Sequence, residues 1–202
     1  MRYKSRMNFM TRIIIILVLG LGISGVIAYS QIKNETTMKV VEKNFGGPFT
    51  LTDQDGKEVT EKDYEGQYRL IYFGFTYCPA ICPTELQRMA SVLKDLSPKG
   101  DLITPIFITV DPERDTVDTM KQYVELFHPR LIGLTGTPEQ IKEITKAYKI
   151  YYAKVQDETM SDYTMDHSSF IYFMAPNNDL LKIFKMDDEI DYMVKTIHRF
   201  ID

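Results

Sequence analysis

The sequence predicts an α/β domain with a parallel sheet at its centre, preceded by a single transmembrane anchor. Three observations support this prediction. Continuous apolar runs alternate with amphipathic segments through residues 69–149, a polar stretch precedes the domain, and an uncharged apolar run at residues 13–29 follows a basic N-terminus. Alternation of this kind is typical of parallel strands joined by helices that cover the faces of the sheet.

The composition indicates an ordinary folded unit with no nucleic-acid partner. Of the 202 residues, 44% are hydrophobic and 26% are charged, and the formal net charge is −4. Such a balance is normal for a globular domain. Binding to phosphates requires a basic face or stripe, and the sequence contains none. Two cysteines are too few for a disulfide-stabilised fold. The core therefore depends on burial of apolar side chains, and the cysteines are available for chemistry.

The N-terminal region is predicted to anchor the chain in a membrane. The apolar run at residues 13–29 is close to the roughly 20 residues that span a bilayer and exceeds the roughly 7 to 15 of a signal peptide. Cleavage after Ala28 is the alternative. Basic residues before the run place residues 1–12 in the cytoplasm. Residues 30–45 are polar without a clear period, which is typical of a linker.

The predicted anchor also suggests where the domain works. With a cytoplasmic N-terminus, the domain lies on the outer side of the membrane. The chain lacks a long Arg- and Ser-rich presequence, which favours a bacterial inner membrane with the domain in the periplasm over a mitochondrial inner membrane.

The domain is predicted to occupy residues 46–202 and to open with a hairpin. Residues 49–51 and Val59 flank the turn sequence DQDG, which suits a small edge hairpin. The run at residues 69–75 is apolar and aromatic throughout, as a strand covered on both faces requires. Residues 83–96 begin with proline and continue with apolar residues at helical spacing, so a helix follows this strand directly.

The remaining elements repeat the alternation and then change it. Strands are predicted at 102–110 and 131–134, helices at 116–127 and 138–149, strands without intervening helices at 150–155, 168–175 and 180–185, and a last helix at 189–200. A β-α-β unit, an added helical crossover and a β-β-α end follow the order of a thioredoxin-like fold. The sequence therefore predicts a thioredoxin-like fold with an N-terminal hairpin and a helical insertion.

Both cysteines fall in the turn between the strand at 69–75 and the helix that follows it. Cys78 lies in the turn and Cys82 lies where the helix begins. A helix N-terminus favours thiolate over thiol, and the thiolate is both the nucleophile and the metal ligand. The three-residue spacing permits a disulfide or shared metal coordination and does not choose between them. Two buried small side chains are the purely structural alternative.

One of the three histidines is a candidate third ligand. His128 and His198 are predicted to have surface or capping roles, with His128 a favourable cation at a helix C-terminus. His167 precedes the strand predicted at 168–175, which this topology places near the cysteine turn. A hydrogen-bonded strand-edge histidine is its structural alternative. Two soft thiolates with one imidazole suit Cu(I), whereas zinc usually requires a fourth ligand or water.

With both cysteines in one strand-to-helix turn and His167 before a later strand, the sequence resembles the Sco/SenC family. Members of that family are copper-binding thioredoxin-like proteins that assist assembly of cytochrome c oxidase. The resemblance covers about residues 47–200 and includes LIYFGFTYCPAICP, VDPERDT and DYTMDHSSFIYFMAP. It implies that Cys78, Cys82 and His167 bind copper, as Cu(I) and also as Cu(II). Many relatives carry an acidic residue where this chain has Ala80, a difference that bears on the docking surface or the redox poise.

The resemblance implies a metallochaperone. Such a protein delivers copper by ligand exchange to the binuclear centre in the copper-bearing subunit of cytochrome c oxidase, after receiving it from an upstream copper chaperone. No substrate turnover is needed, so an enzyme is not expected. The alternative is a thiol:disulfide oxidoreductase that reduces cysteines of the same subunit through a mixed disulfide with Cys78 and Cys82. A peroxidase is disfavoured because its usual spacing of threonine and proline before the cysteine is absent: Thr76 is only two positions from Cys78, and residues 73–75 contain no proline.

Two aspartates are candidates to support the ligands from outside the metal site. Asp111 is either a turn residue or a hydrogen-bonding group near the metal, and Asp115 or Thr116 is predicted to cap the following helix. Asp166 precedes His167 directly. Its carboxylate either sets the tautomer of the imidazole ring or faces solvent at the strand end.

Overall fold

The computed structural model describes residues 42–156 and 162–201, together with a few separate positions between 10 and 22. Among these described residues, none of the helices has the length and apolar character needed to cross a membrane. The segments predicted as cytoplasmic N-terminus, anchor and linker lie almost wholly outside the described residues, so they stay predictions.

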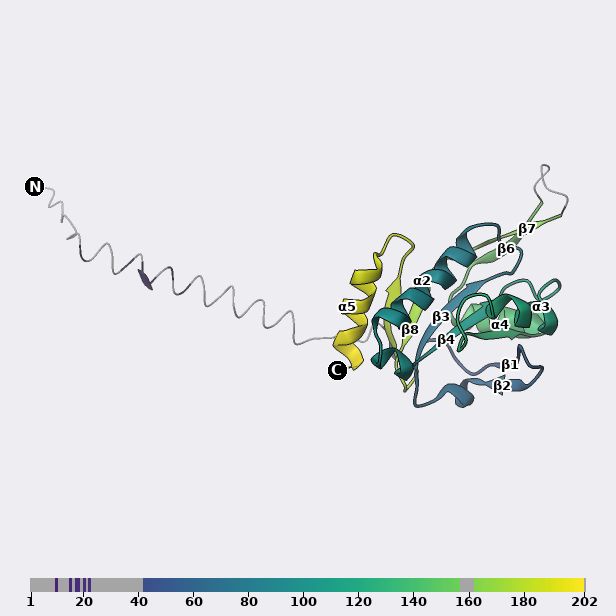
Figure 1. Ribbon diagram of the computed structural model, residues 1–202, viewed down its shortest axis with the longest axis horizontal. Helices are drawn as coiled ribbons and strands as arrows, with labels where there is room; N and C mark the ends of the chain where they lie inside the picture. The colour runs from purple at the N-terminus through teal and green to yellow at the C-terminus, as the bar shows by residue number, and fades with distance from the viewer. Residues whose placement is uncertain are drawn as a thin grey trace, which may run out of the picture. The chain divides into compact units, whose positions relative to one another are not determined.

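The domain is built on a seven-stranded mixed sheet (Figure 1). Its strand order is β2-β1-β5-β4-β3-β8-β9, and a separate two-stranded sheet pairs β6 with β7. The strands are β1 (Thr50–Asp53), β2 (Glu58–Thr60), β3 (Tyr68–Gly74), β4 (Ile103–Thr109), β5 (Ile132–Thr135), β6 (Tyr152–Val155), β7 (Thr164–His167), β8 (Ile171–Met174) and β9 (Leu180–Phe184). Strands β3, β4 and β5 are parallel, whereas the other ladders are antiparallel.

Helices connect these strands as the alternation predicts. They are α2 (Ile81–Asp95), α3 (Val117–Val124), α4 (Pro138–Ala147) and α5 (Ile190–Ile201), with short 3-10 helices at Glu61–Tyr64 and Lys99–Leu102. Helices α2 and α5 pack side by side (Figure 1). Thr116 and Thr137 cap α3 and α4 by accepting a hydrogen bond from a first-turn N–H, which satisfies one otherwise unpaired donor.

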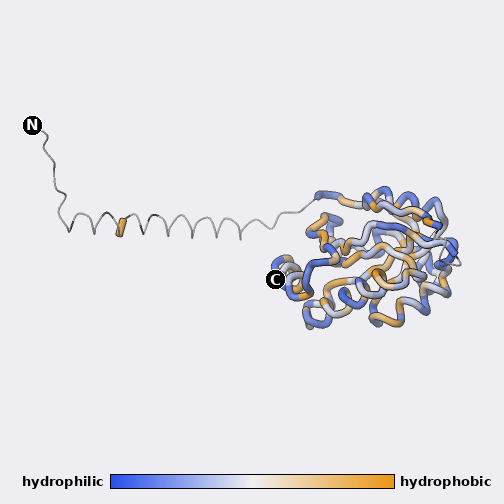
Figure 2. The backbone as a smooth tube through the Cα atoms, turned by 90° about the horizontal axis from the view of Figure 1, so that it is seen from above, coloured by the Kyte–Doolittle hydropathy of each residue, from blue (hydrophilic) through white to orange (hydrophobic). Residues whose placement is uncertain are grey.

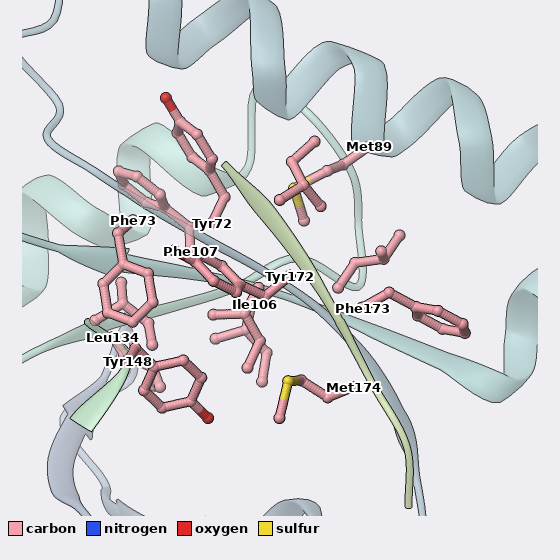
Figure 3. Packing of buried hydrophobic residues seen from close by; sticks show 14 of the residues in the cluster. Tyr72, Phe73, Met89, Ile106, Phe107, Leu134, Tyr148, Tyr172, Phe173 and Met174 are labelled. Atoms are coloured by element: carbon pink, nitrogen blue, oxygen red, sulfur yellow. The ribbon is translucent and has the colours of Figure 1, made fainter. Parts of the chain in front are cut away.

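Strand β3 is an interior strand of the sheet and supports the core on both faces. It pairs with β4 on one side and with β8 on the other. On one face the Tyr72 ring stacks on Phe107 with centroids 6.3 Å apart, and on the other Phe73 meets Tyr148 at 5.3 Å. Figure 3 shows these rings with other buried side chains, while the turns around the outside of the domain are mostly hydrophilic (Figure 2). The predicted central strand is confirmed.

The domain's packing extends into residues that the sequence assigns to the linker. Phe45 is buried and stacks on Tyr172 with centroids 5.7 Å apart. The backbone of Glu42 forms a bridge with that of Leu180. The last part of the predicted linker therefore contributes to the core and to the sheet edge.

The region before β8 differs from its prediction. The single strand predicted at 168–175 is wrong at its start, because β8 begins at Ile171 and a further strand, β7, ends at His167. Ser168 separates the two strands: its N–H donates to the Tyr151 carbonyl, and its hydroxyl accepts from the Tyr151 N–H. The Ser168 hydroxyl takes the Tyr151 N–H that a further ladder bond would use, so the strand ends there.

Candidate metal centre

The cysteine turn leaves β3 at Gly74 and enters α2 at Ile81. Cys78 is half-buried in the turn, and Cys82 is fully buried inside the first helical turn. The helix therefore begins two residues before the predicted start at Pro83. Proline is tolerated there because the first N–H groups of a helix have no intrahelical partner.

The sulfur of Cys78 caps α2. The residue at the N-cap position, Ala80, is exposed and provides no side-chain cap. Instead the Cys82 N–H donates to the Cys78 Sγ at 3.3 Å. An unpaired helix N–H and the positive end of the helix dipole both favour negative charge on this sulfur.

The two thiols have opposite shifts in pKa. A hydrogen bond from the Cys82 thiol, with further help from His167, lowers the pKa of Cys78 to about 4. The hydrogen bond to Cys78 and burial away from water raise the pKa of Cys82. Cys78 is therefore the thiolate at neutral pH, and Cys82 holds the proton that stabilises it.

The ring of His167 directs its Nε2 toward the thiols. Its Nδ1 lies 3.0 Å from the Ser168 carbonyl oxygen, which can only accept, so Nδ1 carries the proton. Its Nε2 lies 3.5 Å from the Cys82 Sγ. The rings of Phe75 and Tyr72 meet the imidazole edge-on at centroid distances of 5.8 and 6.2 Å. These contacts hold the ring with Nε2 directed at the cysteine sulfurs.

The donor atoms suit a soft metal ion. Bond lengths of the kind zinc has, about 2.3 Å to sulfur and 2.0 Å to nitrogen, put two tetrahedral ligand atoms about 3.5 Å apart, and the Cys82 Sγ and His167 Nε2 are separated by 3.5 Å. In the part of the chain that the structure describes, no three His, Cys, Asp or Glu side chains already form a closed metal cage.

A cavity of about 280 Å³ opens beside these groups and is lined by Cys78, Ala80, Asp166 and His167 among others. Asp166 is exposed, and the hydrogen bond to Nδ1 of His167 comes from a backbone carbonyl. The tautomer-setting function that the sequence offers for Asp166 is thus performed by the backbone, while the carboxylate remains at the rim of the cavity.

Gly74 makes room for the buried sulfur. A Cβ at this position would lie 2.8 Å from the Cys82 Sγ and 3.0 Å from the rings of Tyr72 and Phe107. We expect Gly74→Ala to lower the free energy of unfolding by about 2 kcal/mol, because overpacking displaces well-packed neighbours. Chemical denaturation measures the loss. Gly47→Ala, whose Cβ would meet only Ala147 at an ordinary 3.6 Å, is the control. Equal unfolding midpoints for the two variants would contradict this reading.

The two aspartates of the VDPERDT segment are buried and bonded to other groups than the thiols. Asp111 is buried and accepts hydrogen bonds from Arg114 and from the Tyr163 hydroxyl. Asp115 is buried and accepts from the N–H and hydroxyl of Thr76. Thr116, not Asp115, caps α3. Asp115 therefore supports the cysteine turn through Thr76, a role that the sequence did not predict. The available signal was its place in the VDPERDT motif, which follows the strand beside β3.

The other two histidines do not line the cavity beside the thiols. His128 Nδ1 accepts a hydrogen bond from the Arg130 N–H, and burial lowers the pKa of His128. It caps a turn as a neutral acceptor, so the predicted capping role holds while the predicted cationic form is wrong. His198 lies in α5.

Comparisons with known proteins agree on one family. The family model described as SCO1/SenC matches residues 38–202. The chain is 44% identical over 160 residues to "Protein SCO1 homolog 1, mitochondrial" of Arabidopsis thaliana, an alignment that covers 77% of this chain and 48% of that protein. The chain spans about half the length of the first curated relatives that it matches.

Two solved structures are similar in both fold and sequence. Arabidopsis thaliana ScoI with copper bound has a TM-score of 0.73 and 43% identity, covering 77% of this chain and 98% of that one. BsSco, described as a member of the Sco family of cytochrome c oxidase assembly proteins with a disulfide switch, has a TM-score of 0.60 and 26% identity, covering 78% and 95%. These similarities confirm the predicted thioredoxin-like α/β domain.

Proposed function

This chain belongs to the SCO1/SenC family, and we propose that it is a metallochaperone that delivers copper to the binuclear copper centre of cytochrome c oxidase. One observation carries the proposal: the Nε2 of His167, whose Nδ1 is bonded to a backbone carbonyl, faces the Cys82 sulfur at 3.5 Å. The copper-bound ScoI relative and the oxidase-assembly description of BsSco support it.

Copper is the cargo of this proposed site. Cys78, Cys82 and His167 are the ligands, and two thiolates with one neutral imidazole prefer Cu(I). Loading requires Cys82 to release its proton, because a coordinated sulfur is a thiolate. Cys78 is the more accessible sulfur, so an incoming thiolate of the copper-bearing oxidase subunit replaces Cys78 first. Ligand exchange of this kind leaves the oxidation state of copper unchanged.

The proposal places the domain outside the membrane. We expect an uncleaved anchor at residues 13–29 to hold it at a bacterial inner membrane. Residues 46–202 then form the copper-binding domain in the periplasm, where an upstream copper chaperone loads it and the oxidase subunit receives the metal.

Copper binding by ligand variants tests the proposal. The full chain, fully reduced, is expected to bind one Cu(I), measured by competition with a chromophoric chelator. We expect Cys78→Ser to abolish tight binding and His167→Ala to weaken it about a hundredfold, because each change removes a ligand. His128→Ala, which removes a histidine that caps a turn, is the matched control with unchanged binding. Copper held equally tightly by parent and His167→Ala would overturn the proposal.

Thiol:disulfide exchange is the second candidate, favoured by the low pKa of Cys78 beside a protonated Cys82. In this reaction the Cys78 thiolate attacks a target disulfide and expels one target thiolate. Cys82 then loses its proton and attacks the Cys78 sulfur, releasing the second thiolate. The target disulfide gains two electrons and Cys78–Cys82 is oxidised to a disulfide. His167→Ala separates the candidates, because it removes a copper ligand and leaves both thiols.

A further inference from the structure

The ligands come from two parts of the fold that share no sheet. Cys78 and Cys82 lie between β3 and α2, whereas His167 ends β7. Strand β7 pairs only with β6 among the described residues, in a sheet separate from the seven-stranded one. The β3–β8 ladder holds the chain only from Ile171 onward, so side-chain contacts complete the positioning of His167 relative to the sulfurs.

Arg114 contacts both ligand-bearing segments. Its guanidinium carbon lies 4.9 Å from the ring centroid of Tyr77, the residue before Cys78, and 3.7 Å from that of Tyr163, at the entry to β7. Its Nη1 donates to the Tyr163 carbonyl oxygen at 2.8 Å. One planar cation thus joins the cysteine turn to the strand that carries His167.

A buried carboxylate holds this arginine in place. The Arg114 Nε donates to the Asp111 Oδ2 at 2.5 Å, and the Tyr163 hydroxyl donates to the Asp111 Oδ1 at 2.8 Å. Asp111 is 1% exposed, and 14% of the Arg114 side chain is exposed. Both Asp111 oxygens are used within this group, so they are not directed at the thiols. Burial strengthens these charge-assisted hydrogen bonds.

We propose that Arg114 is a positioning residue for copper: with Asp111 and Tyr163 it sets the separation between His167 and the two sulfurs. This inference rests on the proposed function. Arg114 does not touch the metal and acts through His167. Its side chain cannot be replaced by lysine, because an ammonium does not provide a planar group that stacks on two rings while donating two directed hydrogen bonds.

A double-mutant cycle tests the inference with Cu(I) and the full chain. We expect Arg114→Ala and Arg114→Lys each to lower Cu(I) affinity about tenfold in the parent, the size of effect that residues supporting a ligand have. In a His167→Ala background the same changes are expected to have no effect, since the ligand they position is gone. Arg130→Ala is the control, because Arg130 also donates to backbone carbonyls, those of Gly100 and Ile103.

A metal-free measurement separates positioning from general stability. In Arg114→Ala we expect faster amide hydrogen exchange in the β6–β7 pair and unchanged exchange in β3. Tyr163→Phe, which removes only the hydroxyl bonded to Asp111, should give the same exchange pattern at smaller amplitude. If Arg114→Ala fails to fold, this variant still tests whether the group positions the β6–β7 pair.

The outcomes distinguish the two proposals. Copper binding that His167→Ala does not weaken overturns the proposed function and this inference with it. Copper binding that His167→Ala weakens but Arg114→Ala leaves unchanged overturns the inference alone. An equal loss from Arg114→Ala in both backgrounds also overturns it, because the arginine then acts on the fold and not through His167.

Discussion

Replacing Cys82 with alanine is expected to move the pH at which Cys78 becomes reactive upward by about 2 pH units or more. The hydrogen bond from Cys82 is the largest cause of the low pKa of Cys78, which is about 4. A thiol with a lowered pKa is a thiolate above that value, and only the thiolate is alkylated. The parent's alkylation rate should therefore be constant at neutral pH and fall as the pH drops through about 4.

The measurement is the alkylation rate of the reduced, metal-free chain by iodoacetamide as a function of pH. Cys82 is fully buried, so labelling reports Cys78. Cys82→Ser is the matched control, because its hydroxyl still donates to the Cys78 sulfur and should keep the midpoint low. A Cys82→Ala profile that coincides with that of the parent would show that another group stabilises the thiolate.

Replacing Asp115 with alanine is expected to lower the free energy of unfolding by about 3 kcal/mol. Its carboxylate is fully buried and accepts hydrogen bonds from the Thr76 N–H at 3.0 Å, the Thr76 hydroxyl at 2.6 Å and the Thr109 hydroxyl at 2.6 Å. Alanine leaves these donors without their acceptor. Because Thr76 begins the cysteine turn, the change should also loosen that turn.

Guanidinium unfolding followed by circular dichroism measures this loss. Asp55→Ala is the control, since Asp55 and its partner Lys121 are both exposed and exposed ion pairs contribute little to stability. Faster alkylation of Cys82 in Asp115→Ala than in the control would report the loosened turn. If both variants unfold at the same denaturant concentration, the buried hydrogen bonds of Asp115 do not stabilise the cysteine turn.

Local patterns were sufficient to predict the main sheet and its helices. The apolar run of β3, the alternation that follows it and the turn before β9 each depend on a short stretch of sequence. Periodicity failed before β8, where Ser168 ends one strand and a second begins after it. The hydrogen bonds that cause this break involve Tyr151, which is distant in sequence, so no local pattern contained them.

The sequence by itself determined the α/β class, the strand-to-helix turn that carries both cysteines, and the residue types that suit copper. These follow from hydrophobic periodicity and from the chemistry of sulfur and imidazole, which are properties of single residues and short segments. Only the tertiary structure decided that Nε2 of His167 faces Cys82, that Asp115 supports the turn, and that Arg114 joins the two halves of the site. Those contacts join segments far apart in the chain, and folding brings them together only through packing and long-range hydrogen bonds.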